Sequence, residues 1–224
     1  SSANSINIAR LIPQSFYYFS AYSKLKNKNN TVVSVPSGNF GNITAGLLSK
    51  KMGLPIKKFI ASTNDNKAVP DFIINGFYKP YKTIQTISNA MDVGNPSNMI
   101  RIFDLYKNNI DLIKNDIVSW SFNDKQTKQH VLDILKKYNY ILDPHCAVGL
   151  LGLEKFIKLN NCKNPGVCLA TAHPSKFSDV IEPLIKCNID MPDRLKDLIS
   201  KEKRSIKINN DFDEFSDYLL SNFK

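Results

Sequence analysis

Arginine is scarce in this chain, although the net charge is strongly positive. The 224 residues carry a formal charge of +10 at pH 7, and nearly all of the positive charge comes from lysine dispersed among asparagine and isoleucine. Arginine, the residue best suited to bidentate phosphate contacts, occurs at Arg10, Arg101, Arg194 and Arg204. Nucleic-acid binding favours cations clustered on one face. We therefore expect no nucleic-acid partner.

Long apolar runs and metal-binding patterns are also missing. No stretch approaches the roughly 20 apolar residues that a membrane span needs, so we expect no membrane association. The cysteines form no Cys-x-x-Cys pair and have no histidine at zinc-finger spacing, so we expect no metal site. Unpaired cysteines are typical of a reducing compartment, and we expect a cytoplasmic protein. The cysteines are Cys146, Cys162, Cys168 and Cys187.

The residues that are present have the composition of a globular domain. Hydrophobic residues make up 42% of the chain and charged residues 22%, which is enough to bury one core. The chain has no initiator methionine and opens in what reads as a helix entry, with Asn4 or Ser5 as the cap. We therefore expect that an amino-terminal part of the natural protein is missing here.

Apolar periodicity predicts strands that alternate with helices. This order implies parallel pairing with right-handed crossovers, so we predict an α/β fold, a parallel sheet with helices on both faces. We expect a large domain over 1–190 and a helical tail over 191–224. The stretch 76–97 breaks the rhythm, and so long an irregular segment usually carries function or is mobile. Strands are predicted at 31–35, 56–62 and 166–170, and helices at 5–25, 42–52, 66–75, 98–114, 124–138, 147–159, 193–201 and 211–222. The helix 66–75 is expected to end at Gly76, and Asp143 is expected to cap the entry to the helix 147–159, with Pro144 in its first turn.

The first predicted strand runs directly into a polar loop, 36–41, and then a helix. A helix start presents unpaired N–H groups and a partial positive charge, which favour an anion. Gly38 and Gly41 allow close approach and positive φ, while Asn39 and Asn42 tolerate the same conformation and add side-chain donors. The loop has no cation, so main-chain donors would have to hold the anion.

The glycine spacing restricts the kind of phosphate ligand. A nicotinamide dinucleotide site needs Gly-x-Gly-x-x-Gly and an acidic residue after the second strand, but this loop has only two glycines, and Ser62-Thr63-Asn64 follows the second strand. A P-loop needs Gly-Lys-Ser/Thr, which this loop also lacks. The strand at 166–170 ends similarly, at Thr171-Ala-His-Pro174, and ligands sit at the carboxyl ends of parallel strands. A monophosphate site fits best, although the two glycines alone fit a plain strand-to-helix turn equally well.

Motifs along nearly the whole chain resemble those of threonine synthase, a family of fold type II enzymes that use pyridoxal 5'-phosphate. The match is weakest in 105–140 and after 190. The resemblance implies a tryptophan synthase β-like fold. In chain order, the motifs are Ser2-Ala-Asn-Ser-Ile-Asn-Ile-Ala-Arg10, Val35-Pro-Ser-Gly-Asn-Phe-Gly-Asn42, Ser88-Asn-Ala-Met-Asp92, Asp143-Pro-His145 and Thr171-Ala-His-Pro-Ser-Lys-Phe177.

The resemblance implies a cofactor, a substrate and a reaction. Threonine synthases convert O-phospho-L-homoserine and water to L-threonine and phosphate by β,γ-replacement in threonine biosynthesis. By resemblance, the hydroxyl of Thr171 lies on the pyridine nitrogen, where it stabilises a pyridinium less than a carboxylate would. By the same resemblance, the cofactor phosphate is held by Gly38, Asn39, Phe40, Gly41 and Asn42.

The family's Schiff-base lysine lies upstream of the Ser-Ala-Asn-Ser-Ile-Asn motif, in sequence that is not present here, and no lysine of this chain matches its context. We therefore read the chain as the carboxyl-terminal portion of the enzyme and assign it no catalytic residue. The missing amino-terminal part is its expected partner. Alone, the chain should bind pyridoxal phosphate weakly and turn nothing over.

Several polar residues have both a functional and a structural interpretation. Ser88, Asn89 and Asp92 either contact substrate or gate the site, or they only make local turns in the loop. His173 either approaches the substrate phosphate or acts as an acid, or it only caps or packs against the helix that follows, and this structural interpretation is favoured. Lys176 either meets that phosphate or is solvated.

Three further expectations concern packing. His130 is expected to face solvent. His145, in the first turn of a helix, is expected to be structural, although the family motif implies that it lies near the cofactor ring. The aromatic cluster 16–19 is expected to pack in the core rather than against a cofactor.

Two other functions remain open. Another type II lyase, a serine or threonine dehydratase, is the nearest alternative enzyme, although the motifs 2–7 and 171–177 favour the synthase. A non-catalytic phosphate-binding module is the alternative from another class, because the chain lacks the lysine.

Overall fold

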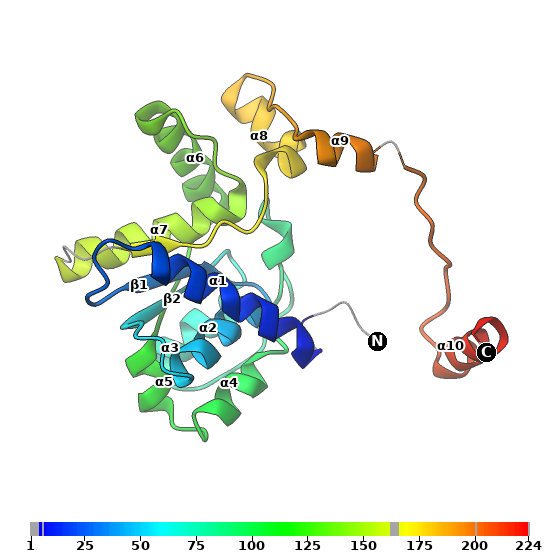
Figure 1. Cartoon of the computed structure of the whole chain (residues 1–224), viewed down its shortest axis with the longest axis horizontal. Helices are drawn as coiled ribbons and strands as arrows, with labels where there is room; N and C mark the ends of the chain where they lie inside the picture. Colours follow the sequence, from blue (N-terminus) through cyan, green and yellow to red (C-terminus); the bar gives the residue numbers. More distant parts are fainter. Residues whose placement is uncertain (1–4, 6, 162–165, 200, 224) are drawn as a thin grey trace. The chain divides into compact units, whose positions relative to one another are not determined.

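The computed structural model describes residues 5, 7–161, 166–199 and 201–223. The chain divides into two compact units, one ending at Ile189 and the other beginning at Asp190. In the first unit, four parallel strands form one sheet in the order β3-β2-β1-β4. Figure 1 labels β1 and β2 of this sheet. The strands are β1 Val32–Pro36, β2 Lys58–Thr63, β3 Ile117–Ser121 and β4 Gly166–Cys168.

Helices connect the strands. The predicted helices at 42–52, 66–75 and 124–138 agree closely with α2, α3 and α6 below, and α3 ends as expected at Gly76, which has φ 77°. The helices and 3-10 turns of this unit are η1 Ile8–Arg10, α1 Leu11–Lys24, α2 Gly41–Lys51, α3 Ala68–Asn75, η2 Asn89–Met91, α4 Met99–Leu105, α5 Ile110–Asp116, α6 Asp124–Tyr138, α7 Pro144–Asn160, η3 Pro174–Phe177 and α8 Ser178–Ile185.

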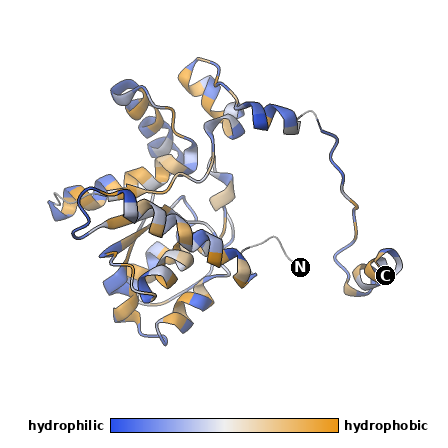
Figure 2. Ribbon diagram, viewed as in Figure 1, coloured by the Kyte–Doolittle hydropathy of each residue, from blue (hydrophilic) through white to orange (hydrophobic). Residues whose placement is uncertain are grey.

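Strand residues alternate between two apolar clusters, which confirms the predicted parallel sheet with helices on both faces. Val33 and Val35 of β1 pack in the cluster that also contains buried side chains of α1 to α5. Val32 packs with Leu153 and Phe156 of α7 on the opposite face. Figure 2 shows hydrophobic residues, in orange, on both sides of the sheet. The sheet is therefore buried from both sides, as parallel sheets are.

Helix α7 lies unusually close to the sheet because of two glycines. A Cβ added to Gly152 would lie 1.9 Å from Ser62 Oγ, and one added to Gly149 would lie 3.0 Å from a ring carbon of Pro36. The hydroxyl of Ser34 in β1 donates to the carbonyl oxygen of Gly149 at 2.6 Å. These contacts fix the start of α7 against the carboxyl ends of β1 and β2.

Two elements of the sequence prediction need correction. The range 98–114 was expected to be one helix, but it contains α4 and most of α5 with turn residues Tyr106 to Asn109 between them. Strand β3 was not predicted, because Ile117-Val-Ser-Trp-Ser121 follows α5 without a glycine or proline to mark the change. It pairs with β2, Phe59 lying opposite Ile117, and among the described residues it is the last strand on that side of the sheet.

The first helix begins later than predicted. Of the two expected caps, Asn4 lies outside the described residues and Ser5 lies before the turn; instead Asn7 caps η1, accepting the N–H of Ala9 at 3.1 Å. Pro13 lies in the first turn of α1, where its missing N–H costs no helix hydrogen bond.

Only one member of the aromatic cluster 16–19 packs in the core. Tyr18 is buried, whereas Phe16, Tyr17 and Phe19 are exposed, so the expectation of core packing was wrong for these three. A cluster of four consecutive aromatic residues cannot all lie on one face of a helix, because successive side chains point about 100° apart.

The expectation that His130 faces solvent was also wrong. Its side chain is buried between α6 and α7, and its Nε2 lies 3.9 Å from a carboxylate oxygen of Glu154. Burial lowers the pKa of His130, and the nearby carboxylates of Glu154 and Asp133 offset this only in part. The ring is therefore neutral in the folded protein over a range of pH in which the unfolded chain is protonated.

The second unit contains two helices, α9 Asp193–Ile199 and α10 Phe212–Asn222. The carboxylate of Asp211 caps α10 by accepting the N–H of Glu214 at 2.9 Å. Within the described residues of the whole chain, no helix combines the length and apolar character that crossing a bilayer requires.

His130 should make stability depend on pH. Because its folded pKa lies below the unfolded value of about 6.5, the unfolded state binds the proton first, and stability falls as pH decreases below about 7. In urea denaturation of the intact protein, His130→Gln should show a smaller loss of stability between pH 7 and pH 5.5 than the wild type does. Equal pH slopes would contradict the assignment.

Candidate functional site

The candidate site lies where the connections leave the sheet in opposite directions. From β1 the chain passes through α2 to β2, which is the neighbour of β1 on one side in the strand order. From β3 it passes through α6 and α7 to β4, which is the neighbour of β1 on the other side. In open α/β sheets, ligands bind outside the carboxyl ends of the strands at such a switch point. The loop after β1 and the segment after β4, which contains Thr171, both lie there.

The loop between β1 and α2 turns on Phe40, which has φ 61° and ψ 13°. The positive φ was expected at Gly38 and Gly41, and that expectation was wrong, because neither glycine has it. A bulky residue in the left-handed region is strained by roughly 1 to 2 kcal/mol. Burial of the Phe40 side chain in the main core cluster offsets this strain.

The two glycines are needed for close approach instead. A Cβ on Gly38 would lie 2.6 Å from the Cα of Met91, and a Cβ on Gly41 would lie 2.8 Å from the Cβ of Ser5. The first contact is with backbone, which cannot move aside as a flexible side chain can. The segment around η2 therefore lies directly against the loop.

Asparagine side chains anchor the loop to its neighbours. The amide oxygen of Asn39 accepts from the N–H of Ser97 at 2.6 Å, and its NH2 group donates to Ser5 Oγ at 2.7 Å. The hydroxyl of Tyr18 donates to Asn42 Oδ1 and O, both at 2.8 Å. The asparagines, rather than adding donors to a ligand, fix the path of the backbone.

The main-chain N–H groups from residue 38 to residue 43 have no acceptor among the described residues. Hydrogen bonds occupy the N–H of Ser37, which donates to Ser62 O at 2.8 Å, and of Thr44, which donates to Phe40 O at 3.1 Å. Between these two residues, no hydrogen bond from a main-chain N–H to any described residue occurs. Six consecutive donors, from residue 38 to residue 43, are thus available.

These donors border a cavity of about 220 Å³. None of its lining side chains is a lysine, arginine, aspartate or glutamate, so an anion held there would depend on neutral donors and the start of α2. The structure places all six predicted cofactor residues around this one cavity. It is lined by Ser5, Gln14, Pro36, Ser37, Gly38, Asn39, Phe40, Gly41, Asn42, Ile43, Ala90, Met91, His145 and Thr171.

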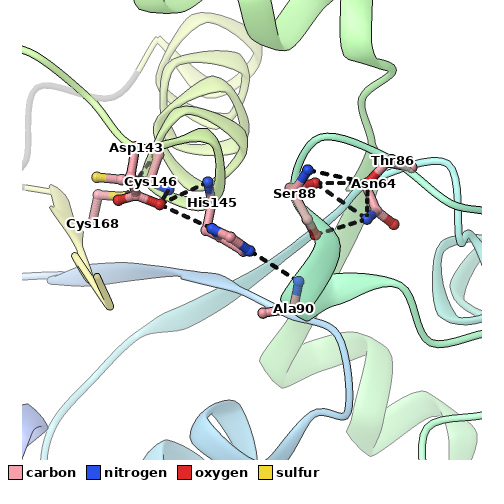
Figure 3. Close-up of polar contacts among 8 residues, drawn as sticks. All are labelled: Asn64, Thr86, Ser88, Ala90, Asp143, His145, Cys146 and Cys168. Atoms are coloured by element: carbon pink, nitrogen blue, oxygen red, sulfur yellow. Dashed lines mark hydrogen bonds and ion pairs between the residues drawn. The ribbon is translucent and has the colours of Figure 1, made fainter. Parts of the chain in front are cut away.

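His145 connects the start of α7 to η2 (Figure 3). Its Nδ1 lies 3.0 Å from Asp143 Oδ1, and its Nε2 accepts the N–H of Ala90 at 3.2 Å. Since Nε2 is an acceptor here, the network assigns the proton to Nδ1, which donates to the carboxylate. Asp143 also caps α7 by accepting the N–H groups of His145 and Cys146, as the sequence predicted. His145 is structural, as expected, but it also lines the cavity.

Asn64 organises the irregular segment from the other side (Figure 3), and sequence reasoning missed it. Its NH2 group donates to Thr86 Oγ1 at 2.8 Å and to Asp92 Oδ1 at 2.8 Å, and lies 3.2 Å from Ser88 Oγ. Asn64 is buried, and a buried amide that loses such partners is costly. Its position directly after β2, at the ligand-binding edge of the sheet, was the signal available.

The residues predicted to contact substrate fall into different environments. Ser88 and Asp92 belong to the Asn64 network, which favours the local-turn interpretation for both. His173 accepts the N–H of Ser175 at 3.2 Å and caps η3, as favoured from the sequence. Asn89 and Lys176 line a second cavity of about 370 Å³, between the η2 segment and the start of α8.

Two thiols, of the buried Cys146 and the half-buried Cys168, lie beside Asp143 (Figure 3). A hydrogen bond between the thiols lowers the pKa of Cys146, and the same hydrogen bond, together with burial, raises the pKa of Cys168. In the described residues, no group of three His, Cys, Asp or Glu side chains is arranged to hold a metal ion.

Comparison with known proteins relates the chain to a single kind of enzyme. A family model described as "Threonine synthase, C-terminal" matches residues 146–219. The threonine synthase of Buchnera aphidicola subsp. Baizongia pistaciae is 44% identical over 221 residues, 98% of this chain and 50% of the relative. That of Escherichia coli is 43% identical over 87% of this chain and 45% of its own length. The chain therefore spans about half the length of the curated relatives that it matches.

Solved structures agree with this fold. The threonine synthase of Escherichia coli superposes with a TM-score of 0.84 at 39% identity, covering 99% of this chain and 51% of that one. The threonine synthase of Brucella melitensis, solved with bound PLP, gives 0.85 at 29% identity, covering 99% and 52%. A fungal L-serine ammonia-lyase from Rhizomucor miehei gives 0.57 at 13% identity, which shows a common fold only. The predicted fold class, that of type II pyridoxal-phosphate enzymes, is confirmed.

A methyl group at position 38 tests the close approach of loop and η2. Gly38→Ala should destabilise the protein by about 1 to 3 kcal/mol, because the new Cβ meets the Met91 backbone and one segment must shift. Urea denaturation measures this. Gly76→Asn is the matched control, since among the described residues only the tip of Lys114, at 3.9 Å, lies within 4 Å of a Cβ there, and asparagine is accepted in the left-handed conformation that follows a helix. Equal stability of Gly38→Ala and wild type would refute the contact.

Proposed function

The chain is homologous to the threonine synthases, and we propose that it is the carboxyl-terminal portion of such an enzyme. The whole protein would convert O-phospho-L-homoserine and water to L-threonine and phosphate, using pyridoxal 5'-phosphate. The observation that carries the proposal is the row of unpaired N–H groups from residue 38 to residue 43 beside the cavity that Thr171 also lines.

The residues of the cavity fit the phosphate of the cofactor. Unpaired N–H groups at a helix start need an acceptor, and a dianionic phosphate supplies several acceptor oxygens to neighbouring donors. An added Cβ at Gly38 or Gly41 would collide with the walls of the cavity, so the backbone itself forms the cradle. Gly38, Asn39, Phe40, Gly41 and Asn42 would hold the phosphate through their main-chain N–H groups.

Thr171 would bind the pyridine nitrogen through its hydroxyl. The residue follows β4 and lines the same cavity as the loop after β1. When bound, pyridoxal phosphate supplies an electron sink for negative charge that develops on the amino-acid substrate. A neutral hydroxyl on the ring nitrogen, in place of a carboxylate, would moderate that sink. This suits a reaction in which charge must move along the substrate to expel phosphate.

The second cavity suits the distal part of the substrate. Asn89 supplies an amide there and Lys176 an exposed ammonium group, but the carboxylates of Asp124 and Asp179 also line this cavity, so a phosphate would have to lie against Lys176 and away from both carboxylates. An ammonium group attracts a phosphate as a point charge. His173 lies three residues before Lys176, in the same motif. Ser88 and Asp92 would position Asn89 through the Asn64 network rather than touch the substrate themselves.

The rest of the enzyme would supply the lysine that links the cofactor. No lysine is among the residues that line the cavity of about 220 Å³, and the chain spans about half the length of its relatives. The partner that completes the site would be the part of the same polypeptide outside these 224 residues. We also propose a cytoplasmic location, since Cys146, Cys168 and Cys187 are free thiols, as reducing compartments favour.

A substrate comparison tests the proposed activity. The full-length protein with pyridoxal phosphate should release phosphate and form threonine from O-phospho-L-homoserine, and it should form little 2-oxo acid from serine or threonine. A protein that deaminates serine or threonine and ignores phosphohomoserine would be a dehydratase. A protein that binds the cofactor and acts on none of the three would be a binding module. The 224 residues alone should turn nothing over.

Thr171→Val in the full-length protein tests the ring-nitrogen contact. The substitution removes the hydroxyl at nearly constant volume, and losing one hydrogen bond of about 1 to 3 kcal/mol should lower kcat about 5-fold to 100-fold. Thr171→Ser, which keeps the hydroxyl, is the control and should retain most of the activity. The two variants having equal kcat values would mean that the hydroxyl plays no part.

A further inference from the structure

Helix α1 carries an apolar stripe that the described residues do not cover. Ile12 is 60% exposed and Phe16 61% exposed, and Ile8 and Phe19 extend the stripe at both ends. The spacing of four, four and three residues places these side chains on one side of the helix. The opposite side of α1 packs against the core through Leu11 and Tyr18.

A continuous groove runs beside this stripe, between α1 and α2. It consists of two hollows, of about 500 and 660 Å³, which share Leu11 and Leu48 in their walls. We call it the α1–α2 groove. Its lining is Ile8, Leu11, Ile12, Ser15, Phe16, Phe19, Thr44, Leu48, Lys51, Met52, Ile100, Arg101, Asp104 and Leu105.

Such a surface is unusual for a part of a protein that faces water. Isolated exposed apolar residues are normal, but a contiguous hollow lined by aromatic and aliphatic side chains marks a place where another surface packs. Burying the four side chains of the stripe would contribute several kcal/mol, at about 25 cal/mol for each Å² removed from water. The question is which surface occupies the groove.

The length of the relatives points to one occupant. About half of each relative has no counterpart in this chain. The groove shares none of its described lining residues with the cavity bordered by residues 38 to 43, so the groove is a separate surface, and its apolar lining calls for a partner of its own.

We propose that the part of this protein's polypeptide outside these 224 residues packs apolar side chains into the α1–α2 groove. The inference rests on the proposed function, which makes the chain part of a longer enzyme. A covalently joined segment has an effective concentration of the order of millimolar, which favours it over a second copy at cellular concentration. Lys51 and Asp104 line the groove as well and give both signs of charge to its rim.

Photocrosslinking of the full-length protein tests this. With Phe16 replaced by p-benzoylphenylalanine, irradiation should give a crosslink within one polypeptide, without a shift to dimer size. Mass spectrometry should place the other end in sequence outside the 224 residues. Leu159, at the end of α7 and 65% exposed, is the control position and should give at most a small fraction of that crosslink.

Each other outcome overturns the inference. A crosslink of dimer size would assign the groove to a second copy. No crosslink at position 16 above that at position 159 would leave the groove open to solvent. A natural polypeptide with nothing beyond these residues would remove the occupant. The readout is independent of turnover, so a crosslinked protein that forms no threonine would refute the proposed function and leave the docking surface standing.

Placing a charged side chain in the groove tests its burial by a second measurement, the stability of the full-length protein in urea. Phe16→Asp in the full-length protein should lower the urea midpoint markedly, because the carboxylate would be buried on packing. Leu159→Asp should change it little. Equal midpoints for the two variants would contradict burial of position 16.

Discussion

Unpaired peptide N–H groups at the start of α2 are the constraint on which the site depends. Six consecutive donors have no acceptor among the described residues, and leaving such groups away from water and without a partner costs free energy comparable to a lost hydrogen bond. A fold keeps such a feature when a ligand supplies the acceptors. The absence of charged side chains from the cavity means that backbone geometry, rather than a lysine or arginine, would select the anion.

The neighbouring elements hold that geometry. Phe40 turns the chain in a conformation that its own burial stabilises. Because Gly38 has no Cβ, the η2 segment can lie directly against the loop. His145 of α7 holds that segment in place by accepting the N–H of Ala90. Asn64 holds the same segment from the end of β2. Elements far apart in sequence thus contact one loop or its neighbours. A substitution in any of them should alter the shape of the cavity.

The sequence predicted the features that depend on local patterns. The polar loop after an apolar strand, the cap at Asp143 and the helix stop at Gly76 all follow from residue types and spacing. Features that depend on tertiary packing were missed: the burial of His130 between two helices, the positive φ at Phe40 rather than at a glycine, and the Asn64 network. The predicted strand ends already placed Thr171 and the loop at one edge of the sheet, and the resemblance supplied only the role of Thr171.

A crystal structure of the full-length protein with pyridoxal phosphate tests the central claim most directly. The account predicts phosphate oxygens within about 3.2 Å of several main-chain nitrogens between residues 38 and 43, with the ring nitrogen near Thr171. A phosphate bound elsewhere, or those nitrogens hydrogen-bonded to another part of the polypeptide, would contradict it.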